Sequence, residues 1–60
     1  MKTTAEQMYR QGYALPQYGL FKYAWRYYDQ IIELPFSALE PKEVDGWPCA
    51  RWHDVQKAAI

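Results

Sequence analysis

The order of apolar and polar residues divides the chain into segments, and the first of them favours a helix. Over residues 3–13, apolar side chains recur at helical spacing on one face, and charged or amide side chains occupy the other. The run Thr3-Thr4-Ala5-Glu6 has the spacing of a capping box, and Glu6 precedes Arg10 by four residues, the favourable order for an ion pair. The pattern predicts a first helix from Thr3 to about Tyr13.

Two patterns compete in the aromatic segment that follows. One is the alternation typical of a strand, carried by Phe21, Tyr23, Trp25 and Tyr27. This alternation fails at Tyr28 and does not return through Ile31 and Ile32, whereas a period of 3.6 sorts the whole segment into an apolar and a polar half. The longer pattern favours a helix from Pro16 to Glu33, ended by Pro35. A strand over residues 21–27 is the alternative.

The apolar half of this expected second helix is unusually wide. A helix on the surface of a globular domain needs an apolar stripe of little more than about 100°, and this one covers about half the circumference. Because two short helices cannot cover so much surface, we expect a second partner, which could be another chain.

The remainder of the chain predicts an extended segment and one more helix. Pro35 and Pro41 prevent a long helix after residue 34, and Asp45-Gly46 is a turn signal. Pro48 suits the first turn of a helix from Trp47 to about Ala59. The expected fold is all-α: a small three-helix domain with an extended Pro-containing segment before the last helix, over residues 1–60 as a single domain.

Composition narrows the class of protein. The 60 residues carry seven Lys or Arg, seven Asp or Glu, and a formal net charge of zero, whereas nucleic-acid-binding domains usually carry a basic excess. Eleven residues are aromatic, which argues against intrinsic disorder. Cys49 is the single cysteine, so an internal disulfide is excluded. With no signal-peptide pattern and no apolar stretch of about 20 residues, we expect a cytoplasmic protein that does not enter a membrane.

Candidate catalytic and metal-binding residues are few. Cys49 and His53 are four residues apart, but a zinc site needs three or four protein ligands and the chain has no other Cys or His. Asp29 and Glu33 would share a helix face as paired carboxylates sometimes do, yet Arg26 is close enough to make them an ordinary charged surface. The three glycines are far apart and form no phosphate loop. We therefore expect no enzyme, no metal and no cofactor.

The aromatic residues point instead to binding. Tyr, Trp and Arg dominate the hot spots of protein–protein interfaces, and this chain has more large rings than a three-helix core should need. The leading hypothesis is a small protein-interaction module that binds, and inhibits or regulates, a larger protein, like a phage-type or mobile-element accessory inhibitor or antitoxin. The expected partner-binding residues are Tyr18, Lys22, Tyr23, Trp25, Arg26 and Tyr28.

Two other classes of function stay open. The first helix, the Leu15–Gly19 turn and the second helix could form a helix-turn-helix regulator that reads DNA, although Asp29 and Glu33 would repel phosphates. Alternatively, the wide apolar face of the second helix could make the protein a structural homo-oligomer subunit. Salt-dependent binding to DNA would favour the first alternative, and self-association would favour the second.

Overall fold

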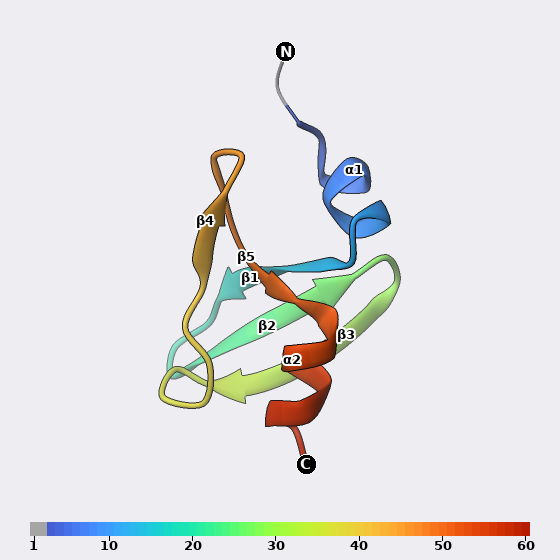
Figure 1. Ribbon diagram of the computed structural model, residues 1–60. Coiled ribbons are helices and arrows are strands. Elements are labelled where there is room, and N and C mark those ends of the chain that lie inside the picture. The colour runs from blue at the N-terminus through green and yellow to red at the C-terminus, as the bar shows by residue number, and fades with distance from the viewer. Residues whose placement is uncertain (1–2) are drawn as a thin grey trace.

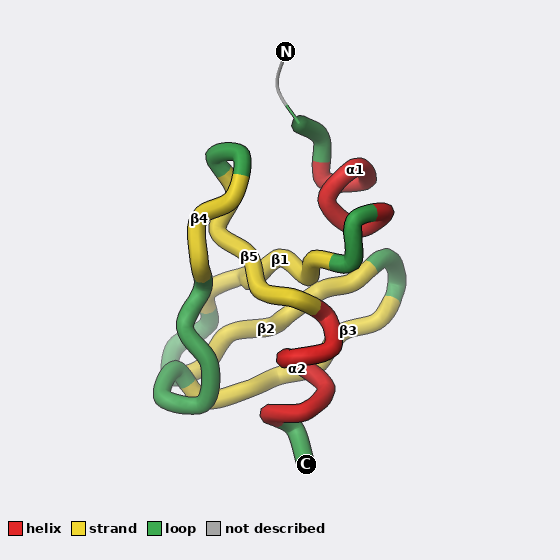
Figure 2. The backbone as a smooth tube through the Cα atoms, viewed as in Figure 1, coloured by secondary structure: helices red, strands yellow, loops and turns green. Residues whose placement is uncertain are grey.

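The computed structural model describes residues 3–60 as an antiparallel sheet flanked by two short helices (Figures 1 and 2). The strands lie side by side in the order β3-β2-β1-β5-β4. The elements in chain order are α1 (Ala5–Arg10), β1 (Tyr13–Tyr18), β2 (Lys22–Tyr27), β3 (Gln30–Pro35), β4 (Lys42–Val44), β5 (Trp47–Arg51) and α2 (Trp52–Ala58).

The expected all-α fold is wrong, and the error is centred on the aromatic segment. No helix covers residues 16–33; they form the end of β1, all of β2 and most of β3. The strand alternation does return after the turn at Tyr28 and Asp29, with Trp25 opposite Ile32 and Tyr23 opposite Leu34. The turn of the β2–β3 hairpin shifts the phase of the strand alternation. Over the whole segment, the shifted alternation resembles a helical period.

The first and last predicted helices are confirmed only in part. The first is shorter than predicted, and its capping box starts one residue later: the Gln7 amide donates to Thr4 Oγ1 (3.2 Å), and the Thr4 amide donates to Gln7 Oε1 (2.8 Å). The predicted pair between Glu6 and Arg10 is present at 3.1 Å. The segment predicted as the last helix is divided, with β5 up to Arg51 and α2 after it.

Two prolines mark the point where β1 and β5 separate. These strands pair only at Tyr13 with Arg51 and at Ala14 with Ala50. Continuing the register would place Pro16 opposite Pro48, and neither has the N–H that a ladder hydrogen bond requires. The second half of β1 therefore pairs with β2 alone, which leaves the β1–β2 hairpin to extend beyond the β1–β5 ladder.

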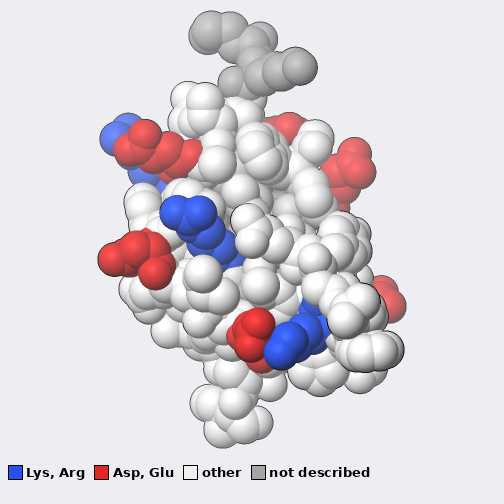
Figure 3. All heavy atoms as spheres, turned by 180° about the vertical axis from the view of Figure 1, so that it is seen from behind, with Lys and Arg blue, Asp and Glu red and all other residues white. Residues whose placement is uncertain are grey.

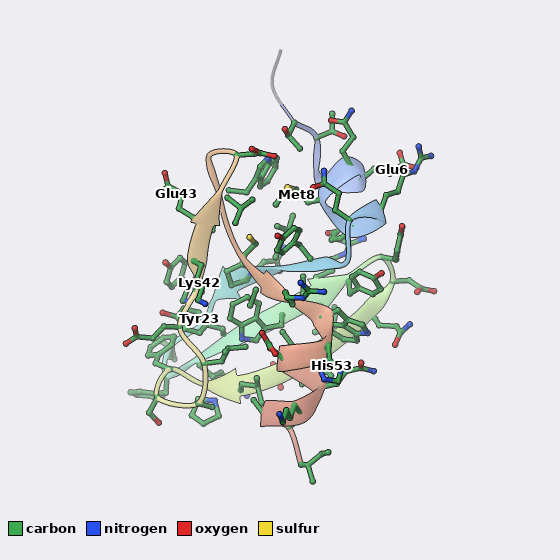
Figure 4. The ribbon with its side chains drawn as sticks, viewed as in Figure 1. Glu6, Met8, Tyr23, Lys42, Glu43 and His53 are labelled. Carbon is green, nitrogen blue, oxygen red and sulfur yellow. The ribbon has the colours of Figure 1, made fainter. Side chains whose placement is uncertain are left out.

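The core is divided between the two faces of the sheet. On one face, α2 packs over a cluster of Ala14, Trp25, Leu34, Ala50, Trp52 and Val55. On the other, Met8 of α1 points at the sheet and packs with Leu15 and Cys49 (Figure 4). Because neighbouring residues of a strand point to opposite faces, Ala14–Leu15 and Cys49–Ala50 each supply both clusters. The sheet itself is thus shared by two small cores.

Candidate functional site

The turn between β1 and β2 exposes two large apolar side chains. Tyr18 pairs with Tyr23, and the Gly19 amide donates to the Lys22 carbonyl at 2.9 Å, which closes the turn. Leu20 and Phe21 lie at its tip and are 86% and 80% exposed. Two adjacent apolar side chains of this size are usually packed away from water, so their exposure at a hydrogen-bonded turn needs a reason.

Several aromatic rings pack against one another beside this turn. The ring centroids of Tyr18 and Tyr23 are 5.2 Å apart, and those of Tyr23 and Phe36 are 4.6 Å apart. Tyr23 also contacts the buried ring of Trp25, with a centroid distance of 5.7 Å. Figure 4 shows Tyr23 at the end of the sheet where β2 begins. We call this surface the tip patch and define it as the exposed side chains of Tyr18, Leu20, Phe21 and Phe36 together with the half-buried ring of Tyr23.

The charges beside the tip patch are balanced rather than basic. Lys22 Nζ lies 3.2 Å from Glu33 Oε1, and both side chains are exposed. Seen from behind in Figure 3, Lys and Arg lie beside Asp and Glu, with broad uncharged areas between them. The field at this surface is therefore weak, and association at the tip patch would depend on apolar contact more than on long-range attraction.

The structure separates the six residues expected to bind a partner. Tyr18 and Tyr23 belong to the tip patch, whereas Trp25 is completely buried and is a core residue. Lys22 and Arg26 point to the sheet face opposite Trp25, and Arg26 Nε donates to the Tyr28 carbonyl at 2.7 Å. Tyr28 is in the β2–β3 turn, at the other end of β2. The six residues therefore do not form one surface.

Leu20, Phe21 and Phe36 belong to the exposed surface but were not among the expected partner-binding residues. The expected helix over residues 16–33 placed Leu20 and Phe21 on its apolar half, and Phe36 lay in the expected extended segment after it. The available signal was Gly19 between two alternating runs, which is a hairpin cue. Large apolar residues directly after such a glycine fall at the turn, where no strand can cover them.

A second group of rings lies around the β2–β3 turn, at the opposite end of β2. Tyr27 stacks on Trp52, with centroids 5.0 Å apart and an interplanar angle of 12°. Tyr9 of α1 contacts Tyr27 and Tyr28 at 6.0 and 5.1 Å. These rings join both helices to the hairpin, so much of the aromatic content is structural. The surplus that suggested a partner is smaller than the count implied, and it is concentrated at the tip patch.

The residues considered for chemistry are dispersed. Cys49 is buried in β5, and desolvation by burial raises the pKa of its thiol, so the nucleophilic thiolate is disfavoured. His53 is exposed on α2 (Figure 4) rather than on one helix with Cys49. A pocket of about 230 Å³ beside Cys49 is lined by charged groups of both signs, among them Lys42, Arg51 and Asp54. Within residues 3–60, no three His, Cys, Asp or Glu side chains are grouped to hold a metal.

Neither helix in the described part of the chain is long and apolar enough to cross a membrane. No protein-family model, curated protein or solved structure matches the chain.

Proposed function

We propose that the protein is a small interaction module that binds a larger protein through the tip patch. The observation that carries this proposal is the exposure of Leu20 and Phe21 on a closed turn. Functional residues often lie on loops that a rigid scaffold positions, and exposed apolar clusters are typical of protein-binding surfaces. The expected partner offers an apolar groove or pocket that can receive the two side chains.

The rings beside the turn support this proposal because they pack three of the five side chains of the tip patch, Tyr18, Tyr23 and Phe36, against one another. Tyr23 is held between Tyr18 and Phe36 and rests on Trp25 in the core. A surface ordered in advance loses less conformational entropy on binding than a flexible loop does. Aromatic anchors that fill a pocket also carry a large share of the binding energy in known interfaces.

The mode of action that fits this geometry is steric. A hairpin tip that occupies the groove of a larger protein excludes other ligands from the same groove, so the module would act as an inhibitor or regulator. The proposal includes no bond making or breaking. The anchor residues proposed here are Leu20 and Phe21, whereas the sequence pattern alone suggested Trp25.

The test is capture of host proteins by the immobilised chain, compared between matched variants. We expect the double substitution Leu20→Ser, Phe21→Ser to abolish capture of a specific protein at unchanged thermal stability, since both side chains are exposed in the monomer. Ile60→Ser removes another fully exposed apolar side chain, far from the turn along the chain, and should leave capture intact.

Three outcomes would contradict the proposal. One is equal capture by the double variant and the wild type, and another is loss of capture in both the double variant and Ile60→Ser. The third is the absence of any captured protein at micromolar bait concentrations. When a protein is captured, a photo-crosslinking side chain introduced at residue 21 tests the contact directly, because the crosslink must join the turn to the captured protein.

Two starting alternatives lose their structural basis. The helix-turn-helix hypothesis needs a reading helix over residues 16–33, where the structure has strands. The homo-oligomer hypothesis placed its interface on the wide apolar face of that same helix.

A further inference from the structure

The outer edge of β3 has unpaired backbone groups. Tyr27 and Gln30 close the two-residue turn to β2, so the pairs Trp25–Ile32 and Tyr23–Leu34 exchange the ladder hydrogen bonds. The N–H and C=O groups of the alternate residues, Ile31 and Glu33, therefore point away from β2. β3 is the outermost strand of the sheet, and no backbone hydrogen bond of a turn, loop or cap within residues 3–60 involves these four groups.

The sequence along this edge favours pairing with itself in one register. Two antiparallel copies can align their outward residues in three ways that keep hydrogen bonds near the centre. Placing Ile31 opposite Ile31 also brings Glu33 opposite Asp29 of the turn, and placing Glu33 opposite Glu33 brings two carboxylates together. The second of these also sets Pro35, which has no N–H, opposite Ile31. Both registers therefore combine like charges.

The third register has neither defect. It places Ile31 of each copy opposite Glu33 of the other, so that each such pair exchanges two hydrogen bonds across the axis. Ile32 then meets its own counterpart at the two-fold axis, in the closer non-hydrogen-bonded position, where two β-branched side chains pack well. Pro35 lies outside this ladder, and its carbonyl already accepts from the Ala38 amide at 2.9 Å.

We propose that the protein forms a symmetric dimer in which two β3 strands pair antiparallel in this register and make one continuous ten-stranded sheet. The occupant of the edge is a second copy of the chain. The exposed side chain of Ile31, 59% accessible in the monomer, becomes a cross-strand neighbour of Glu33. The other sheet edge, β4, has only three residues and offers a single outward residue, Glu43, so it is a weaker template. This inference does not depend on the proposed function of the tip patch.

The first test uses proline, which removes the outward N–H without breaking a hydrogen bond inside the monomer. Sedimentation equilibrium of the wild type should show a reversible monomer–dimer equilibrium between micromolar and millimolar concentrations. Ile31→Pro should remain monomeric over this range. The matched control Glu43→Pro places proline at the outward position of the other edge and should dimerise like the wild type. A wild type that stays monomeric up to millimolar concentration would overturn the proposal, as would an Ile31→Pro variant that dimerises normally.

A second pair of variants tests the register and does not rely on proline. Ile31→Lys puts a cation opposite Glu33 of the other copy, and Ile31→Glu puts a carboxylate there, while both lose the same apolar side chain. Because the contact occurs twice in the dimer, the dissociation constant should be at least about tenfold higher for Ile31→Glu than for Ile31→Lys at low salt. Equal constants for the two variants would refute this register.

Amide hydrogen exchange of the wild type gives an independent measurement. The amides of Ile31 and Glu33 should exchange more slowly as protein concentration rises, whereas the amide of Glu43 should not change. Concentration-dependent protection at Glu43, or none at Ile31 and Glu33, would place any association elsewhere and overturn the proposal.

Discussion

Replacing Trp25 with alanine is the substitution for which sequence and structure make opposite predictions. A partner-binding Trp25 on a helix surface could be truncated without unfolding the protein. In the structure its side chain is completely buried between the sheet and α2, in a cluster with Leu34, Trp52 and Val55. We therefore expect Trp25→Ala to destabilise the folded protein strongly rather than to weaken binding alone.

The size of the effect follows from the buried ring and its unpaired nitrogen. Burial of an aromatic side chain removes about 150–250 Å² from water, worth about 4–6 kcal/mol at 25 cal/mol per Å². Trp25 Nε1 is buried without a hydrogen-bond partner, and removing it recovers about 1–3 kcal/mol of desolvation cost. The net loss is about 3 kcal/mol. A domain of 60 residues has a total stability of about 3–9 kcal/mol, so this loss consumes a large part of it.

Urea unfolding followed by circular dichroism measures this change, with Phe21→Ala as the control. Phe21 is 80% exposed, so its truncation should change the free energy of unfolding by less than about 0.5 kcal/mol. Trp25→Phe keeps a ring and eliminates the unpaired N–H, and should cost less than Trp25→Ala. If Trp25→Ala and Phe21→Ala had the same unfolding midpoint, the placement of Trp25 in the core would be refuted.

Three further predictions follow from local geometry. Gly46→Ala should lower the free energy of unfolding by about 1–2 kcal/mol, because Gly46 has φ +81° and a side chain there is opposed by the backbone conformation and not by any neighbouring atom. An unchanged melting temperature would argue against this turn geometry. Trp47→Phe should cost about 0.5–1.5 kcal/mol, since Trp47 Nε1 donates to the Thr3 carbonyl at 2.7 Å, and a double-mutant comparison with Trp25→Phe should be additive. Burial raises the pKa of the Cys49 thiol, so above the usual thiol pKa of about 8.5 the folded protein retains a proton that the unfolded chain releases. The free energy of unfolding should therefore fall as the pH rises above that value, and Cys49→Ala should lack this slope in pH-dependent unfolding.

Some local features could be predicted from the sequence because they depend on neighbours along the chain. The first helix needs only its cap and its apolar face, and the Glu6–Arg10 pair follows from spacing. The Asp45-Gly46 turn joins β4 to β5, with φ of 52° and 81° at these residues. Both conformations suit Asp and Gly in a tight hairpin turn. In each case the interactions that decide the structure span at most a few residues.

The candidate site was predicted less well, because exposure depends on what other segments cover. Tyr18 and Tyr23 were among the expected binding residues and do lie on the tip patch. Trp25 was also among the expected binding residues but is buried against α2, and Leu20, expected on the apolar half of a helix, lies exposed at the turn. No pattern within residues 18–25 distinguishes these positions without the location of α2.

By itself, the sequence of this protein determined where apolar side chains lie along the chain and which turns and caps can form. It left residues 16–33 with a helical pattern and a strand pattern, because both periods fit the same order of residues over short distances. The tertiary structure decided between them: β2 pairs with β1 on one side and β3 on the other, and α2 packs over the buried ring of Trp25 and stacks Trp52 on Tyr27. Such pairing joins residues that are distant along the chain, so local periodicity cannot reveal it. The same pairing leaves Leu20 and Phe21 in solvent and the outer edge of β3 open.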